Sequence, residues 1–146
     1  EALAAAGDAA GAVQERQRLV AANPADIAAQ MALGNAYAAA GRNDAALAQF
    51  RLINRLQPDY PYAYIKQGEL LDASNQTEAA LAAYRAAVAA APGNADAVFT
   101  LASVYRKRGL ISEAIAAYEA GLTLDPARDA ARGALEALRL QESSQP

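Results

Sequence analysis

The sequence contains no cysteine and no histidine among its 146 residues. Without these side chains a protein cannot form a disulfide, use a thiolate or an imidazole in catalysis, or build the common types of zinc site. We therefore expect no metal, no cofactor and no catalytic residue, and a protein that is not an enzyme. Glu69 and Asp72 could be compared with a glycosidase carboxylate pair, but no aromatic platform accompanies them.

Long apolar runs and an excess of positive charge are also missing. No stretch of about 18 apolar residues occurs, so we expect no membrane span. The net charge is −3, whereas a general nucleic-acid binder has a basic face. The single basic run, Arg106–Arg108, is either a solvated helix end or a contact for an acidic partner. The chain begins at Glu1 with neither methionine nor a signal-peptide pattern, which indicates part of a longer protein. The absence of cysteine selects no compartment, so localisation stays open.

Alanine is abundant and supplies most of the 54% of residues that are hydrophobic. Alanine favours helix and fills little space, so the helices of such a chain must approach one another closely. This composition, together with a regular repeat, also suggests a bacterial source with a GC-rich genome.

The dominant pattern is an internal repeat of 34 residues. Four prolines keep this spacing, and so do a glycine row in which asparagine replaces one member, an alanine row and an aromatic row. These rows are Pro24, Pro58, Pro92 and Pro126; Gly7, Gly41, Asn75 and Gly109; Ala12, Ala46, Ala80 and Ala114; and Phe50, Tyr84 and Tyr118. A period of this length is typical of stacked supersecondary units that bury a core only between neighbours.

Each unit is predicted to form two helices. A glycine or asparagine just past the first helix provides a left-handed cap, and a proline follows the second helix. Asn43 or Asp44 is expected to cap one second helix. The predicted helices are 9–22, 27–40, 43–57, 60–74, 77–91, 94–108, 112–124 and 127–141, and residues 1–6 are interpreted as the stub of a further helix.

These units resemble the tetratricopeptide repeat (TPR), whose pattern runs from a large residue through Leu-Gly, tyrosine, alanine and an aromatic residue to proline. The matching positions are Gln30, Leu33, Gly34, Tyr37, Ala46, Phe50, Ile53 and Pro58; Tyr64, Gln67, Gly68, Leu71, Ala80, Tyr84, Ala87 and Pro92; and Val98, Leu101, Ala102, Tyr105, Ala114, Tyr118, Gly121 and Pro126.

The resemblance implies an all-α fold, a right-handed superhelical array of antiparallel helix pairs, or α-solenoid. It implies a partial unit at 1–26, full units at 27–60, 61–94 and 95–126, a capping helix at 127–142 and a tail at 143–146. Gly34, Gly68 and Ala102 are then expected to let paired helices touch.

A TPR array implies a protein–protein interaction scaffold that binds a peptide or helical segment in its concave groove. The repeat register places these candidate residues on the groove: Met31, Asn35, Tyr62, Ile65, Lys66, Glu69, Phe99, Ser103 and Arg106. The apolar row Met31, Ile65 and Phe99 has two equally supported interpretations, contact with a ligand or packing under the adjacent helix. A structural role, as a spacer or through self-association, is the alternative function.

One TPR subset grips the C-terminal carboxylate of chaperone tails with a lysine, asparagines and two further basic residues. Asn35 matches one of these positions. Lys66 stands where an asparagine is expected, and Asp96 and Thr100 replace the basic pair. Because Asp96 would repel a carboxylate, we expect a different kind of protein or peptide partner.

The segment DYPYAYI, residues 59–65, alternates tyrosines as a strand would. The repeat register instead gives each ring its own place. Tyr60 is expected to be a half-exposed hinge residue, Pro61 to occupy the first helical turn, Tyr62 to face the groove and Tyr64 to pack between helices.

Overall fold

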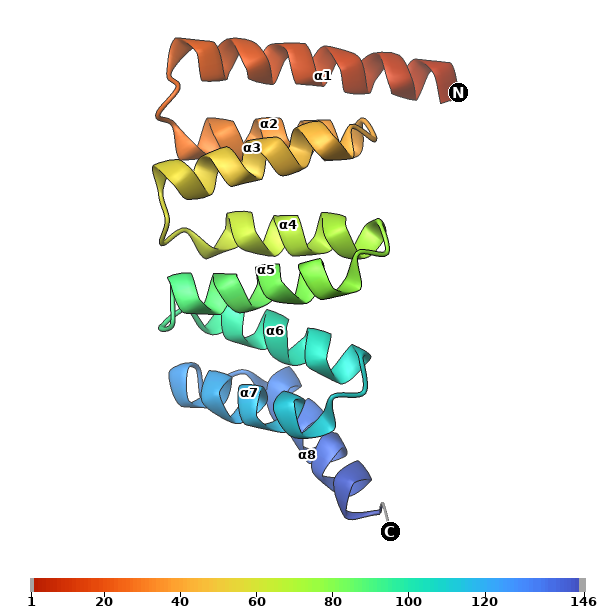
Figure 1. The fold of residues 1–146 in the computed structure, drawn as a ribbon, viewed down its shortest axis with the longest axis vertical. Coiled ribbons are helices and arrows are strands. Elements are labelled where there is room, and N and C mark those ends of the chain that lie inside the picture. The colour runs from red at the N-terminus through yellow and green to blue at the C-terminus, as the bar shows by residue number, and fades with distance from the viewer. Residues whose placement is uncertain (1, 145–146) are drawn as a thin grey trace.

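The computed structural model describes the backbone of residues 2–144 and the side chains of residues 8–144. Within this part the chain forms eight α-helices and no strand, and consecutive helices pack as antiparallel neighbours in a single array (Figure 1). The helices are α1 (Ala2–Ala22), α2 (Ile27–Ala39), α3 (Asn43–Leu56), α4 (Pro61–Ala73), α5 (Thr77–Ala90), α6 (Ala95–Lys107), α7 (Ile111–Leu124) and α8 (Asp129–Ser143).

The turns inside the pairs confirm the predicted left-handed caps. Gly41, Asn75 and Gly109 have φ values of 71°, 58° and 72°, a region that only glycine and, less readily, asparagine adopt at low cost. Pro61 occupies the first turn of α4, where no amide donor is needed. The shared cap geometry fixes the same tight turn in each of the three full pairs.

Two local predictions were wrong. Helix α1 runs without a break from Ala2 through Gly7, so residues 2–6 are not a separate stub. Gly7 is flanked by an alanine and lies in an alanine-rich helix, and one glycine costs a helix only about 1 kcal/mol relative to alanine. Helix α3 begins at Asn43, with Arg42 as its N-cap and no capping side chain, so neither Asn43 nor Asp44 has that role.

Close contact inside the pairs depends on glycines beneath aromatic rings. A Cβ atom on Gly34 would lie 2.5 Å from the Phe50 ring, and one on Gly68 would lie 2.7 Å from the Tyr84 ring. In the third pair the arrangement is reversed, because Gly121 of α7 lies beneath Phe99 of α6, at 2.5 Å from a hypothetical Cβ. Any side chain at these glycines would displace a buried ring.

Successive pairs are joined by polar contacts at equivalent repeat positions. Gln17 donates to the Tyr37 hydroxyl at 2.9 Å, Arg85 to the Tyr105 hydroxyl at 2.9 Å, and Arg139 to Glu119 at 2.6 Å. Each contact links a second helix to the first helix of the next pair. Helices α1 and α8 therefore occupy regular repeat positions, as a second helix and a first helix respectively.

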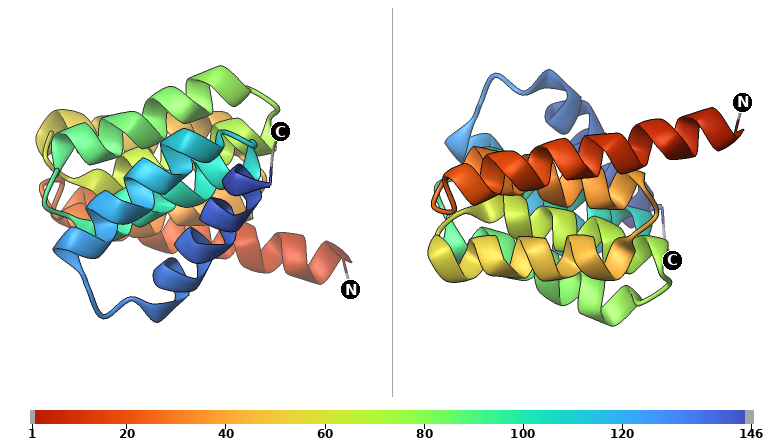
Figure 2. Two further views of the ribbon diagram at one scale, coloured as in Figure 1. Left: turned by 90° about the horizontal axis from the view of Figure 1, so that it is seen from below. Right: turned by 90° about the horizontal axis from the view of Figure 1, so that it is seen from above.

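The two chain ends lie at opposite ends of the array, and α1 extends past its neighbours (Figures 1 and 2). Leu135 and Leu138 of α8 are buried at the C-terminal end. Arg132, Glu136 and Arg139 are exposed there. None of the helices in residues 2–144 combines the length and the apolar character that a membrane crossing requires.

Candidate functional site

The first helices of the pairs line one side of the array, and two of them, α4 and α6, contact each other directly. Between them lies a hollow of about 370 Å³, which we call the α4–α6 hollow. Its lining comes from α4, α5, α6 and the turn before α8, and consists of Glu69, Tyr84, Asp96, Phe99, Thr100, Ser103, Val104, Lys107 and Arg128. The hollow combines an aromatic floor with polar groups of both charges.

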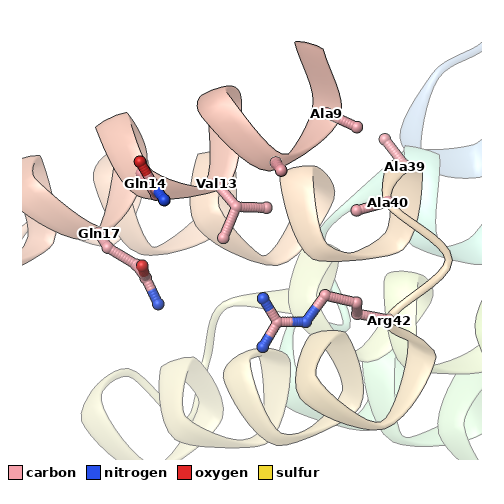
Figure 3. Close-up of a pocket in the computed structure, with 8 residues that line it drawn as sticks. Ala9, Val13, Gln14, Gln17, Ala39, Ala40 and Arg42 are labelled. Atoms are coloured by element: carbon pink, nitrogen blue, oxygen red, sulfur yellow. The ribbon is translucent and has the colours of Figure 1, made fainter. Parts of the chain in front are cut away.

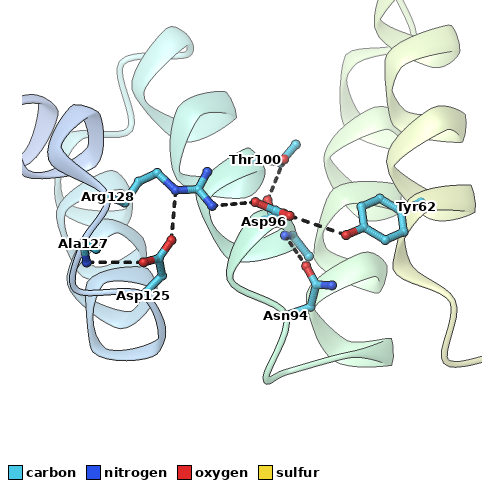
Figure 4. Close-up of polar contacts among 8 residues, drawn as sticks. Tyr62, Asn94, Asp96, Thr100, Asp125, Ala127 and Arg128 are labelled. Atoms are coloured by element: carbon cyan, nitrogen blue, oxygen red, sulfur yellow. Dashed lines mark hydrogen bonds and ion pairs between the residues drawn. The ribbon is translucent and has the colours of Figure 1, made fainter.

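Asp96, in the first turn of α6, organises the polar rim of the hollow (Figure 4). Its carboxylate accepts a hydrogen bond from Arg128 at 2.8 Å and a longer one from the Tyr62 hydroxyl at 3.4 Å. Arg128 also donates to Asp125 at 3.0 Å. Residues from α4, α6 and the turn before α8 are thus held together through one carboxylate.

The α6 N-terminus is itself fixed by its cap. The Asn94 side chain accepts a hydrogen bond from the Ala97 amide at 2.9 Å, and the Thr100 hydroxyl bonds back to the Asp96 carbonyl at 2.7 Å. Asparagine is among the best N-cap residues because its oxygen satisfies an otherwise unpaired amide. The position of Asp96 therefore follows from local sequence.

Arg128 connects the polar rim to the aromatic floor. Its guanidinium lies 5.0 Å from the centre of the Phe99 ring, within the range of a cation–π contact. Hydrogen bonds to Asp96 first and then to Asp125 raise its pKa. Arg128 stays charged, and it lies over the ring that packs on Gly121.

Tyr84 contributes a hydroxyl to the hollow from α5. Its side chain is 5% exposed, and burial, followed by the negative charge of Asp72, raises its pKa above the ordinary value of 10.0. The hydroxyl therefore remains protonated at neutral pH. Because Asp72 takes part in a hydrogen bond with this hydroxyl, the hydroxyl is left to accept a hydrogen bond from a ligand.

The structure brings only part of the predicted groove set together. Glu69, Phe99 and Ser103 line the α4–α6 hollow, and Tyr62 bonds to its rim. Lys66 is paired with Glu69 at 2.6 Å. Arg106 lies on an adjoining hollow of about 230 Å³ that shares Phe99 and Arg128.

The apolar row is mainly a packing row. Ile65 and Phe99 are 8% and 9% exposed and belong to the main core, while Met31 is half-buried against the core of the first pair. For Ile65, this burial favours the second interpretation of the row, packing under the adjacent helices. Phe99 is both a core residue and the floor of the hollow. Asn35 is exposed and does not line the hollow.

The three tyrosines at the start of α4 have the exposures that the sequence predicted. Tyr60 is half-buried as the N-cap residue, Tyr62 is 39% exposed, and Tyr64 is half-buried against the core. The Tyr60 and Tyr62 rings meet edge to face at 5.5 Å between centroids. Tyr60 therefore supports Tyr62 from the side.

Sequence reasoning missed Arg128 and did not place Tyr84 or Lys107 in the site, whereas it expected Asp96 to face a ligand. A signal for Arg128 existed, because it occupies the N-cap position held by Tyr60 and Asn94 in earlier units. An arginine cannot accept a hydrogen bond from the helix amides, so a cap role does not explain it.

A larger hollow of about 550 Å³ lies between α1 and the turn that joins α2 to α3 (Figure 3). It is lined mostly by short side chains: Ala9, Ala10, Val13, Gln14, Gln17, Ala39, Ala40 and Arg42. Its size follows from the alanines, which leave the helices incompletely packed. Arg42 is the one charged residue of this lining, and its guanidinium lies over the Tyr37 ring, 4.7 Å from the ring centre.

Comparison with known proteins agrees with this architecture. Two family models, both described as tetratricopeptide repeat, match residues 6–68 and 65–129, so together they span 6–129. Among curated proteins no sequence matches.

Several solved structures are similar in fold. The crystal structure of MamA is 25% identical, with a TM-score of 0.73, over 94% of this chain and 80% of MamA. TTC0263, a thermophilic TPR protein of Thermus thermophilus, is 23% identical, with a TM-score of 0.74, over 92% of this chain and 74% of its own. The first TPR of Spaghetti (RPAP3), bound to the HSP90 peptide SRMEEVD, is 19% identical, with a TM-score of 0.66, over 81% of this chain and 94% of its own. The chain belongs to the tetratricopeptide repeat family.

Proposed function

We propose that this protein is a binding scaffold whose concave face holds a peptide or helical segment of a protein partner. Membership of the TPR family supports a protein-interaction role in general. The observation that carries the specific proposal is the α4–α6 hollow, where an aromatic floor lies beneath hydroxyls and charges contributed by several elements. Such a mixture of apolar and convergent polar groups is typical of recognition sites.

The lining of the hollow indicates the chemistry of the ligand. Phe99 and Val104 offer an apolar floor for one inserted side chain, and the hydroxyls of Tyr84, Thr100 and Ser103 can bond to the backbone around it. Glu69 and Lys107 provide opposite charges at the rim. A segment with one apolar anchor and mixed flanking charge matches these groups.

A bare C-terminal carboxylate is a poor match for this site. Asp96 presents its carboxylate to the rim, and Arg128, the cation beside it, is already bonded to both Asp96 and Asp125. A ligand carboxylate would have to displace those bonds while facing a like charge. The Spaghetti (RPAP3) TPR, bound to the HSP90 peptide SRMEEVD, shares the fold with this chain. We propose a ligand of another type here.

A random-peptide display library, selected on the immobilised protein, tests the proposal. Ser103→Arg places a long side chain in the hollow, and Ala89→Arg, at an exposed position on α5 away from the hollow, is the matched control. We expect selected peptides to bind the wild type and the Ala89→Arg variant alike, and the Ser103→Arg variant at least about tenfold more weakly. Equal binding to all three proteins would reject the hollow as the site.

A further inference from the structure

Arg128 stands between the α4–α6 hollow and the smaller adjoining hollow of about 230 Å³. The lining residues common to both hollows are Phe99 and Arg128. Because the Arg128 guanidinium lies 5.0 Å from the centre of the Phe99 ring, this side chain covers the ring where the two hollows meet. If the arginine moved aside, the ring would be open from both hollows, and they would join into one groove.

The fold does not need an arginine at this position. Arg128 is the N-cap residue of α8 but makes no side-chain capping bond, and a guanidinium has no acceptor atom for one. The equivalent residues Asp26 and Asn94 do cap their helices through the side chain. Helix α8 is anchored by the buried side chains of Leu135 and Leu138. The role of Arg128 is therefore to be sought in the hollow.

The contacts that hold Arg128 over the ring are exposed. Its side chain is 42% exposed, and those of its partners Asp96 and Asp125 are 52% and 32% exposed. Ion pairs of this exposure contribute little to stability, because both charges remain hydrated. Asp125 lies three residues before Arg128, so this local pair can persist while the bond to Asp96 is exchanged for another. The arginine can leave the ring at small cost.

The place that Arg128 would vacate suits a second guanidinium. One oxygen of Asp96 accepts from Arg128 and the other from the Tyr62 hydroxyl, so the departure of Arg128 frees one oxygen while Tyr62 still holds the carboxylate. The freed oxygen lies beside the uncovered face of Phe99. A planar guanidinium can donate to a carboxylate and stack on a ring at the same time, whereas a neutral side chain would leave Asp96 without a counter-charge.

We propose that Arg128 is a movable side-chain lid, and that the peptide bound in the α4–α6 hollow presents an arginine that takes its place on Asp96 and Phe99. This inference rests on the proposed peptide-binding function, and it adds one ligand residue and a control of access. Asp96 lies in the first turn of α6 and Val104 eight residues later, about 12 Å along the helix. The arginine would occupy the Asp96 end of the hollow and the apolar anchor the Val104 end.

Calorimetric titration with a peptide selected on the wild-type protein tests the exchange. We expect this peptide to contain an arginine. Arg128→Ala removes the competing side chain, so the peptide should bind about two- to fivefold more tightly, the range that an exposed ion pair contributes. The same peptide with its arginine replaced by glutamine should bind both proteins equally. Arg132→Ala, at an exposed arginine one turn along α8, is the matched control and should leave the affinity unchanged.

A small probe tests the arginine place without a peptide. The chain has two phenylalanines, Phe50 and Phe99, so ¹³C labelling of phenylalanine gives one reporter in the site and one internal control. N-acetyl-argininamide should shift the Phe99 ring signals of Arg128→Ala, and shift them less in the wild type, where the lid is in place. Adding Asp96→Asn to Arg128→Ala should abolish the shift. N-acetyl-glutaminamide should shift neither ring, and Phe50, which is 1% exposed, should not respond to either probe.

The outcomes separate this inference from the proposed function. Selected peptides that Ser103→Arg does not weaken would refute the hollow as the peptide site, and the inference with it. Peptides that Ser103→Arg weakens, but that lack an arginine or bind no more tightly to Arg128→Ala, would leave the proposed function intact and overturn the lid. A Phe99 ring in Arg128→Ala that ignores N-acetyl-argininamide, or responds equally to N-acetyl-glutaminamide, would also overturn the lid alone.

Discussion

The first full pair, α2–α3, and the third, α6–α7, each have a buried ring on the second helix, Phe50 and Tyr118, but the third pair has a further ring, Phe99, on its first helix. In the first pair Phe50 of the second helix covers Gly34 of the first, and in the third pair Phe99 of the first helix covers Gly121 of the second. The added ring, Phe99, stands at the position of Met31 and Ile65 and becomes the floor of the α4–α6 hollow. The hollow therefore arises where the repeat departs from its own pattern.

The surfaces above the two pairs differ accordingly. The concave positions of α2 are mainly alanines, with Asn35 exposed among them, and they form no comparable polar cluster among the described side chains. In the third pair Asp96, Thr100 and Ser103 occupy positions equivalent to Ala28, Ala32 and Asn35. The comparison indicates that the regular residues maintain the array, while the departures in the third pair form the hollow that we propose as the recognition site.

The largest expected effect is a loss of stability when the buried ring of the first pair is removed. Phe50 is 1% exposed, so Phe50→Ala should lower the free energy of unfolding by about 3–5 kcal/mol, as a buried aromatic truncation does. Urea unfolding measures this. Leu140→Ala, at a side chain that is 70% exposed, is the control and should change stability by less than about 0.5 kcal/mol. A loss below about 1 kcal/mol for Phe50→Ala would mean that the ring does not hold this pair together.

The next largest effect is expected when the glycine beneath the Phe99 ring of the third pair is replaced. Gly121→Ala would place its Cβ 2.5 Å from Phe99, and overpacking of this kind costs about 1–3 kcal/mol. Gly11→Ala in α1 has nothing within 4 Å of the new atom and should stabilise by up to about 1 kcal/mol through helix propensity. Unfolding curves of the two variants should move in opposite directions, and a shared direction would break the assignment of Gly121.

Tyr62 and Tyr64 divide binding from stability in the middle pair. Tyr62→Ala should weaken a selected peptide by about 1–3 kcal/mol, because the exposed ring and its bond to Asp96 are lost, while the Tm changes little. Tyr64→Ala should lower the Tm, because its ring packs against the core. Calorimetric titration and thermal unfolding of both variants measure this. The reverse pattern would exchange the two roles.

The smallest expected effect is a pH dependence carried by Tyr84. Burial, aided by Asp72, raises its pKa in the folded state above the 10.0 of an ordinary tyrosine. The folded state thus keeps a proton that the unfolded chain loses, so the stabilisation is fully present below about pH 10 and is lost as the pH rises further. The free energy of unfolding, measured below and above this pH, should decrease with rising pH for the wild type. It should decrease less steeply for Tyr84→Phe.

The array could be predicted from the sequence because its determinants lie at fixed spacing. A positive φ at Gly41, Asn75 and Gly109 follows from the residue types that tolerate it. Contact at Gly34 and Gly68 follows from pairing a residue without a side chain with an aromatic ring. These choices are local or recur once per repeat, so one sequence displays them several times.

The site was less predictable because its contacts occur once. Arg128 is the N-cap residue of α8, and the turn before α8 directs its side chain across the hollow to Asp96. No other unit has an arginine at the equivalent position. Ile65 was placed on the groove by register, but its side chain is covered by the neighbouring helices. Register gives the side of a helix, whereas burial depends on the size of the neighbouring side chains.

The most direct test of the claim that recognition belongs to the third pair is an NMR titration. The ¹⁵N-labelled protein would be titrated with a peptide selected on the wild type, and the shift change of every backbone amide recorded. The largest changes should fall in α6, in the facing part of α4 and around Arg128, and those in α2 should be small. Changes concentrated in α1 and α2, or spread over α3, α5 and α7, would contradict the account.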